Sequence, residues 1–161
     1  MMNSLKSNKV AGILTGLFGI AVAGFGAFGL AMVALQRMMM ASAPPAPPHF
    51  EAMMRAVHET WITYLPFMIA GGVIFGVAGF YIYRGSSVAR RIAQITAVLG
   101  IIWIFAYSIA AHRVIQTMTE LPFAQGSAFQ WAITIVNLIL FLAFPVALLF
   151  VLSSPKDDPP A

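Results

Sequence analysis

Four long runs without a charged residue constrain this chain more than any other feature. They extend over residues 10–36, 60–83, 92–111 and 121–154. The hydrocarbon core of a bilayer is about 30 Å thick, so a helix needs roughly 20 apolar residues to cross it. Because hydrocarbon gives the backbone no hydrogen-bond partner, each crossing segment is expected to be a helix.

The runs predict an all-α integral membrane protein with one domain, a four-transmembrane-helix bundle over residues 1–154. The expected crossings are 10–36, 61–83, 92–112 and 129–152, and a polar, proline-rich cytoplasmic tail is expected over 155–161. Composition agrees, because 60% of the residues are hydrophobic and 9% are charged, whereas a soluble domain has roughly 25% charged residues. The net charge of +4 comes from basic residues at the ends of the apolar runs. This placement indicates the lipid bilayer, and no nucleic acid, as the partner of these charges.

Basic residues between the runs predict the orientation of the helices. Loops rich in Lys and Arg stay on the cytoplasmic side of a membrane. With a cytoplasmic N-terminus that side holds Lys6, Lys9, Arg84, Arg90, Arg91 and Lys156, and the outer side holds Arg37, Arg55 and Arg113. We therefore expect a multi-pass protein of the plasma (inner) membrane of a bacterium, with both termini in the cytoplasm. The first run is too long for the core of a signal peptide, so we expect an uncleaved helix.

A proline-rich segment separates the first run from the second. Residues 41–48 read ASAPPAPP, which favours a semi-rigid polyproline II spacer over a helix. In residues 49–60 the apolar side chains fall within one arc of a helical wheel, and Glu51, Arg55 and Glu59 fall opposite. This pattern predicts a short outer-face amphipathic helix between the first two crossings, which runs into the second crossing.

Small residues recur at helical spacing in the first two runs. In lipid, helices associate through close packing rather than hydrophobic burial, so faces of small residues favour contact. The interpretation favoured here is that the first crossing packs on the second through two stripes. One alternative is that a stripe faces another subunit, and another is that small residues are simply common in membrane helices. The predicted packing residues are Gly12, Gly16, Gly19, Gly72, Gly76 and Gly79, and Ala23 and Gly26 continue the first stripe.

Methionines gather in the predicted outer half of the chain, near two histidines. Thioether and imidazole groups are ligands for Cu(I), so His49, Met53, Met54 and His58 are the candidate metal ligands. On a helical wheel the two histidines border opposite flanks of the apolar arc. We therefore expect the methionines to serve as flexible apolar contacts, and no metal or cofactor is predicted.

No charged residue lies inside a predicted crossing, and the milder polar groups are few. An interhelical hydrogen bond is the expected role of such groups. On the third helix Trp103 and Tyr107 share a face, with Ser108 and His112 beside it, which suggests a pocket for a lipid or quinone head group as an alternative to ordinary packing. The other polar residues are Thr15, Gln94, Thr96, Thr134 and Asn137.

The Tyr83-Arg84-Gly85 turn, followed by Ala89-Arg90-Arg91, resembles many small bacterial four-helix membrane proteins of unknown role. The resemblance covers this short segment only. Several other classes of membrane protein are excluded. The chain has no cysteine for a thiol oxidoreductase, no glutamate in the first helix for a drug/proton exchanger, and no histidine pairs inside the bundle for a b-type cytochrome.

These exclusions predict a non-enzymatic protein without catalytic residues. We expect an accessory, assembly or scaffold subunit of a larger membrane complex, with other membrane protein subunits or further copies of this chain as partners. Two alternatives stay open. The first is a small-molecule transporter or channel-type oligomer, for which the polar residues would have to line a path. The second is an outer-face copper-handling protein.

Overall fold

The computed structural model describes residues 2–44, 46–117 and 127–153, and within them all regular structure is helical. The four helices are α1 (Met2–Ser42), α2 (Pro48–Tyr83), α3 (Ser87–Thr117) and α4 (Ser127–Ser153). At 1.5 Å per residue, the 27 residues of α4 span about 40 Å, which exceeds the bilayer core of about 30 Å. All four helices are long and apolar enough to cross a membrane, and the chain is a multi-pass membrane protein. The predicted tail over 155–161 lies outside the described residues.

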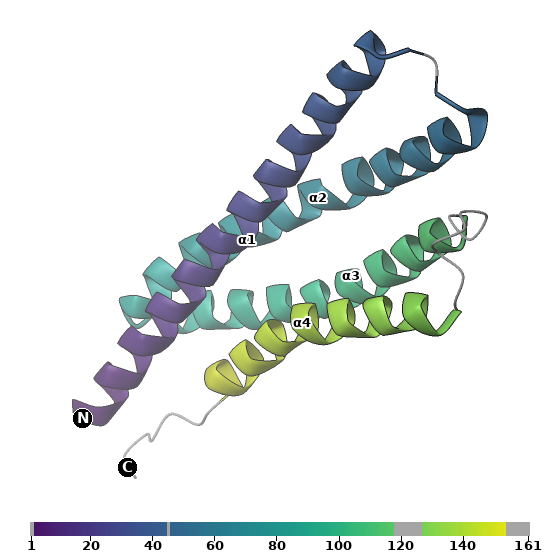
Figure 1. Cartoon of the computed structure of the whole chain (residues 1–161). Helices are drawn as coiled ribbons and strands as arrows, with labels where there is room; N and C mark the ends of the chain where they lie inside the picture. Colours follow the sequence, from purple (N-terminus) through teal and green to yellow (C-terminus); the bar gives the residue numbers. More distant parts are fainter. Residues whose placement is uncertain (1, 45, 118–126, 154–161) are drawn as a thin grey trace.

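The helices run alternately up and down, so the start of α1 and the end of α4 lie at one end of the bundle (Figure 1). We call this the terminal end, and we call the opposite end, where α1 ends at Ser42 and α2 begins at Pro48, the linker end. Figure 1 shows α1 crossing α2, and α3 lying alongside α4. The two pairs meet near the terminal end and diverge toward the linker end. α1 and α4 touch over a short stretch only.

The linker between α1 and α2 begins where the proline-rich segment begins. Pro47 has φ −54° and ψ 140°, which is polyproline II geometry, and Pro48 occupies the first turn of α2, where its missing N–H costs nothing. The expected amphipathic helix forms the first part of α2 and runs into the second crossing as predicted, because α2 continues without a break from Pro48 to Tyr83. Its charged residues Glu51 and Arg55 are exposed, as the wheel predicts.

The turn between α2 and α3 is short because hydrogen bonds close the end of α2. Gly85 has φ +88°, a left-handed conformation that favours glycine. Its N–H donates to the carbonyl of Ile82 (2.8 Å), and the N–H of Ser86 donates to the carbonyl of Tyr81 (3.0 Å). This pattern is a Schellman motif. The N–H of Ala89 then donates to the hydroxyl of Ser86 (3.2 Å), which caps the start of α3.

The core of the bundle lies toward the terminal end, where all four helices contribute. The ring of Phe18 from α1 stacks on Phe144 from α4 at 3.6 Å between centroids and meets Phe75 from α2 edge-on at 5.5 Å. The α3 face in this core is made of alanines, which lets α3 approach its neighbours closely. The buried residues of the core are Ala11, Phe75, Ala78, Ile82, Ala89, Ala93, Ala97, Leu148 and Leu152.

Candidate functional site

Glycines hold the backbones of α1 and α2 against each other. A Cβ built on Gly19 would lie 2.5 Å from the carbonyl oxygen of Gly72, and one on Gly12 would lie 2.5 Å from the backbone nitrogen of Tyr83. In return, a Cβ on Gly79 would lie 2.7 Å from the carbonyl oxygen of Gly12. Any side chain at these positions would force the helices apart, because the atoms it would meet are backbone. The two stripes therefore lie at the α1–α2 contact.

Two members of the stripes differ from this pattern. A Cβ on Gly16 or on Gly76 would meet nothing within 4 Å. The backbones of both residues are nevertheless touched from the opposite helix, Gly16 by the Cβ position of Gly79 and Gly76 by that of Gly19. These two glycines thus lie at the contact, but their missing side chains point away from it. Spacing alone had grouped them with the four glycines whose side-chain positions are blocked.

Polar side chains at the terminal end of α3 bind the end of α4. The Arg90 Nε donates to the carbonyl of Leu152 (2.7 Å) and its second guanidinium nitrogen to that of Val151 (3.1 Å). The amide of Gln94 also donates to the carbonyl of Leu152 (3.0 Å). The last carbonyls of a helix lack partners within the helix, and a cation there also opposes the negative end of the helix dipole. Gln94 therefore joins α3 to the end of α4.

Two threonine hydroxyls, one in α1 and one in α3, bond to the backbone of their own helix. The Thr15 hydroxyl, which is fully buried, donates to the carbonyl of Ala11 at 2.7 Å. That of Thr96 donates to the carbonyl of Ile92 at 2.9 Å. Both bonds lie within one helix, as is usual for Thr in membrane helices. The predicted interhelical role is thus not what these two residues do, and the side chain of Asn137 lies outside the described residues.

Three of the four candidate copper ligands have described side chains, and one of these three, His58, has a hydrogen-bond partner. His58 is buried at 2% exposure, and its Nε2 lies 3.0 Å from Oε1 of Gln36 on α1. This hydrogen bond ties α1 to α2 near the linker end. Met53 and Met54 are half-buried on α2, and the side chain of His49 lies outside the described residues. Within the described part of the chain, no three His, Cys, Asp or Glu residues gather as a metal site.

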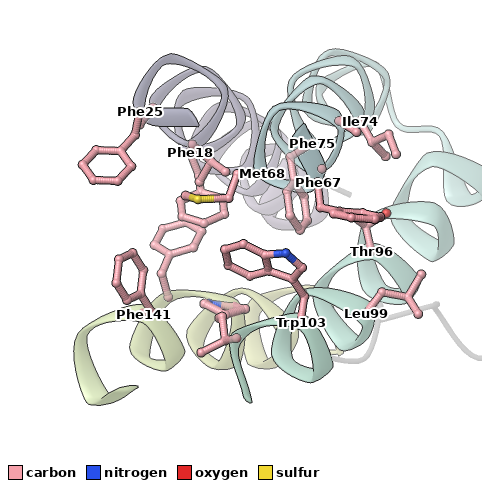
Figure 2. A pocket seen from close by; sticks show the side chains of 18 residues that line it. Phe18, Phe25, Phe67, Met68, Ile74, Phe75, Thr96, Leu99, Trp103 and Phe141 are labelled. Carbon is pink, nitrogen blue, oxygen red and sulfur yellow. The ribbon is translucent and has the colours of Figure 1, made fainter. Parts of the chain in front are cut away.

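All four helices together line an apolar cavity between the two pairs (Figure 2). Its volume is about 430 Å³, and all four helices contribute to its wall. Aromatic rings dominate the lining, and Gly71 and Gly100 leave room among them. A second cavity of about 370 Å³ adjoins it toward the linker end, and the two share Phe25, Met68, Trp103 and Phe141. We call the two cavities together the interhelical cleft.

Two aromatic side chains of α3 that line the cleft pack against each other and against a tyrosine of α2. The rings of Trp103 and Tyr107 stack with 5° between their planes and 5.5 Å between centroids, and Tyr64 from α2 meets both edge-on. The buried Nε1 of Trp103 has no hydrogen-bond acceptor among the described residues.

The sequence-predicted pocket on α3 is thus present in part. Trp103, Tyr107 and Ser108 line the cleft. His112 does not, because its Nδ1 lies 3.4 Å from the hydroxyl of Thr134 on α4 and its ring lies against Trp131 at 4.2 Å. The described lining of the cleft contains no Asp, Glu, His, Lys or Arg. Such a cleft can bind an apolar molecule.

Comparison with known proteins adds nothing to this geometry. No family model, no characterised protein and no solved structure matches the chain. The interpretation of the cleft therefore rests on its own residues.

Sequence reasoning missed the aromatic walls that α1 and α4 give to the cleft. Phe18 and Phe25 are seven residues apart on α1, and Phe141 and Phe144 are three apart on α4. Both spacings place the rings on one face of a helix. That signal was present in the sequence, but it could not say that the two faces meet across one space.

Proposed function

We propose that the protein is a non-enzymatic accessory subunit that associates with a larger complex of the bacterial inner membrane. The observation that carries this proposal is an arm, made of residues 37–42 of α1 and 48–60 of α2, that continues both helices past their predicted crossings. At 1.5 Å per residue the α2 part adds about 20 Å and the α1 part about 9 Å. A chain that only had to sit in the bilayer would not need this extension.

The surface of the arm has the chemistry of a contact surface. Met38 and Met39 are 70% and 62% exposed, and Phe50 is 40% exposed. Methionine and phenylalanine are common where proteins bind one another, because they give apolar area that adapts to a partner. The hydrogen bond between His58 and Gln36 holds the two parts of the arm together at its base. The proposed partner is another membrane protein subunit or a second copy of the chain.

The two alternatives have less support. A transporter or channel needs a polar path. The side chains of Gln94, Thr15 and Thr96 donate hydrogen bonds to backbone carbonyls of the helices. A copper-handling protein needs His58 as a ligand, and Gln36 already engages its Nε2.

Converting the arm methionines to a polar residue of similar shape tests the accessory role. We expect the double variant Met38→Gln, Met39→Gln to lose its place in the complex, because glutamine keeps the helix propensity but removes the apolar contact. On native gels of mild-detergent extracts, wild type should migrate well above its 17.4 kDa mass, and the variant should move toward the monomer. Its thermal stability should equal that of wild type, because both side chains are exposed.

Val88→Gln is the matched control, since Val88 is 66% exposed at the terminal end of α3. It should keep the wild-type migration. Wild type that migrates as a monomer in its detergent micelle would contradict the accessory role, and so would equal migration of the arm variant and wild type.

The orientation is part of the proposal: the terminal end, with Lys9, Arg84 and Arg91, faces the cytoplasm. Since the chain has no cysteine, single cysteines report on it without background. In intact spheroplasts, a membrane-impermeant maleimide should label Pro44→Cys and leave Ser87→Cys unlabelled until the cells are opened. Both positions are exposed. The reverse labelling pattern would overturn the orientation.

A further inference from the structure

The buried indole N–H of Trp103 is a hydrogen-bond donor without an acceptor among the described residues. A buried donor left unpaired costs on the order of 1–3 kcal/mol, and this cost is not reduced inside a bilayer, where water is scarce. Trp103 lines both cavities of the interhelical cleft. Figure 2 shows its ring projecting from α3 into the space between the helix pairs. A ligand in the cleft can therefore supply the acceptor.

The size and lining of the cleft limit what this ligand can be. The cavity of about 430 Å³ is within the range of roughly 300–1,000 Å³ found for small-molecule sites. A partner helix about 10 Å wide that crosses the bilayer occupies about 2,000 Å³ and does not fit. Rings such as Phe18, Phe75 and Phe141 surround the space, which favours a flat ring stacked or packed edge-on among them.

The depth of Trp103 limits the ligand further. Trp103 follows Ile92 by 11 residues and precedes His112 by 9, so it lies about 17 Å and 14 Å from the two ends of that crossing. An acceptor at this depth has to be uncharged, because a charge near the middle of a bilayer is costly. The ester carbonyls of a phospholipid stay beside its charged head group at the membrane surface, and they cannot reach Trp103.

We propose that the interhelical cleft binds a lipid-soluble quinone. Its flat ring lies among the aromatic side chains, one quinone carbonyl accepts a hydrogen bond from Trp103 Nε1, and its apolar chain lies along the cleft. A quinone combines the features that the cleft selects: no charge, a planar ring, carbonyl acceptors and a long apolar tail. The site is one of binding, and it does not depend on the accessory role.

Purified protein in phospholipid nanodiscs tests the site with decylubiquinone as the probe and decylbenzene as a matched ligand without carbonyls. We expect saturable binding of decylubiquinone to wild type, measured by calorimetry, and no competition from decylbenzene at equal concentration. Trp103→Phe keeps the ring and removes the donor, so the dissociation constant should rise by about five- to tenfold.

Two glycines give a matched pair of variants that test the place of binding. A Cβ on Gly100 or on Gly24 would meet nothing within 4 Å, so both positions accept leucine without a clash and both helices gain propensity. Gly100 lines the cleft and Gly24 is exposed on α1. Gly100→Leu should abolish binding and Gly24→Leu should leave it unchanged. Equal binding by these two variants would overturn the proposal, as would competition by decylbenzene or the lack of saturable binding to wild type.

Discussion

Gly19→Leu is expected to destabilise the protein by about 3 kcal/mol, because it overpacks a contact that cannot adjust. A Cβ at residue 19 would already lie 2.5 Å from the carbonyl oxygen of Gly72 and 2.8 Å from the Cα of Gly76. Backbone atoms cannot move aside as the end of a side chain can, so α1 and α2 have to separate along their crossing. Reversible unfolding in mixed micelles measures the loss of free energy, and the thermal midpoint in detergent should fall with it.

Gly16→Leu is the control, three residues earlier on the same helix. Its side-chain position is open, and leucine has a higher helix propensity than glycine by up to about 1 kcal/mol. The variant should therefore be as stable as wild type or more so. If the two substitutions have opposite effects, the stripe is a site of close helix packing. If small residues were only common in membrane helices, the two substitutions would have similar effects. Equal stability of both variants would mean that α1 and α2 do not pack as described.

Arg90→Met is expected to free the end of α4 from α3 and to cost about 2 kcal/mol, the usual range for hydrogen bonds to a charged group. The guanidinium reaches the carbonyls of both Leu152 and Val151, and methionine keeps the length of the side chain but donates nothing. Arg90→Lys should recover only part of the loss, because an ammonium lacks the planar fork that spans two acceptors. Unfolding in detergent gives the stability. Hydrogen exchange should show the last turn of α4 opening before the rest of the helix.

Arg91→Met is the matched control for the loss of a positive charge. Arg91 is exposed on the same turn of α3, and it is expected to contribute to orientation through its charge alone. Its removal should leave the exchange of α4 unchanged. Exchange in α4 that responds alike to both substitutions would contradict the capping role of Arg90.

Much of the architecture could be predicted from the sequence because lipid imposes strong rules on length and charge. A segment that crosses about 30 Å of hydrocarbon has to be long, apolar and helical, so uncharged runs predict the four helices directly. The proline-rich segment marks the end of α1, and the predicted break lies close to Ser42, where α1 ends. The amphipathic segment over 49–60 runs into the second crossing, as its pattern predicted. Pro48 stands at the first turn of α2, where proline starts a helix, and nothing after it interrupts the helix before Tyr83.

The rotation of each helix about its axis could not be read in the same way. In a soluble helix the apolar face marks the side that packs, but lipid is as apolar as a packed interior, and both faces of a membrane helix look alike in sequence. The spacing of the glycines predicted a contact, yet it could not tell Gly19, whose side-chain position is blocked, from Gly16, whose position is open. Only the placement of α2 against α1 decides between them.

The same reason explains why the candidate site belongs to the tertiary structure. The sequence determined that this chain has four segments long and apolar enough to cross a membrane, with no charged residue inside the four apolar runs, since length and composition alone answer that question. It also marked Trp103 and Tyr107 as one face of α3. Only the meeting of four helices placed Phe18 and Phe141 across the cleft from that face and left Trp103 Nε1 without an acceptor among the described residues. A cleft is the space between surfaces, and no single helix carries the information for it.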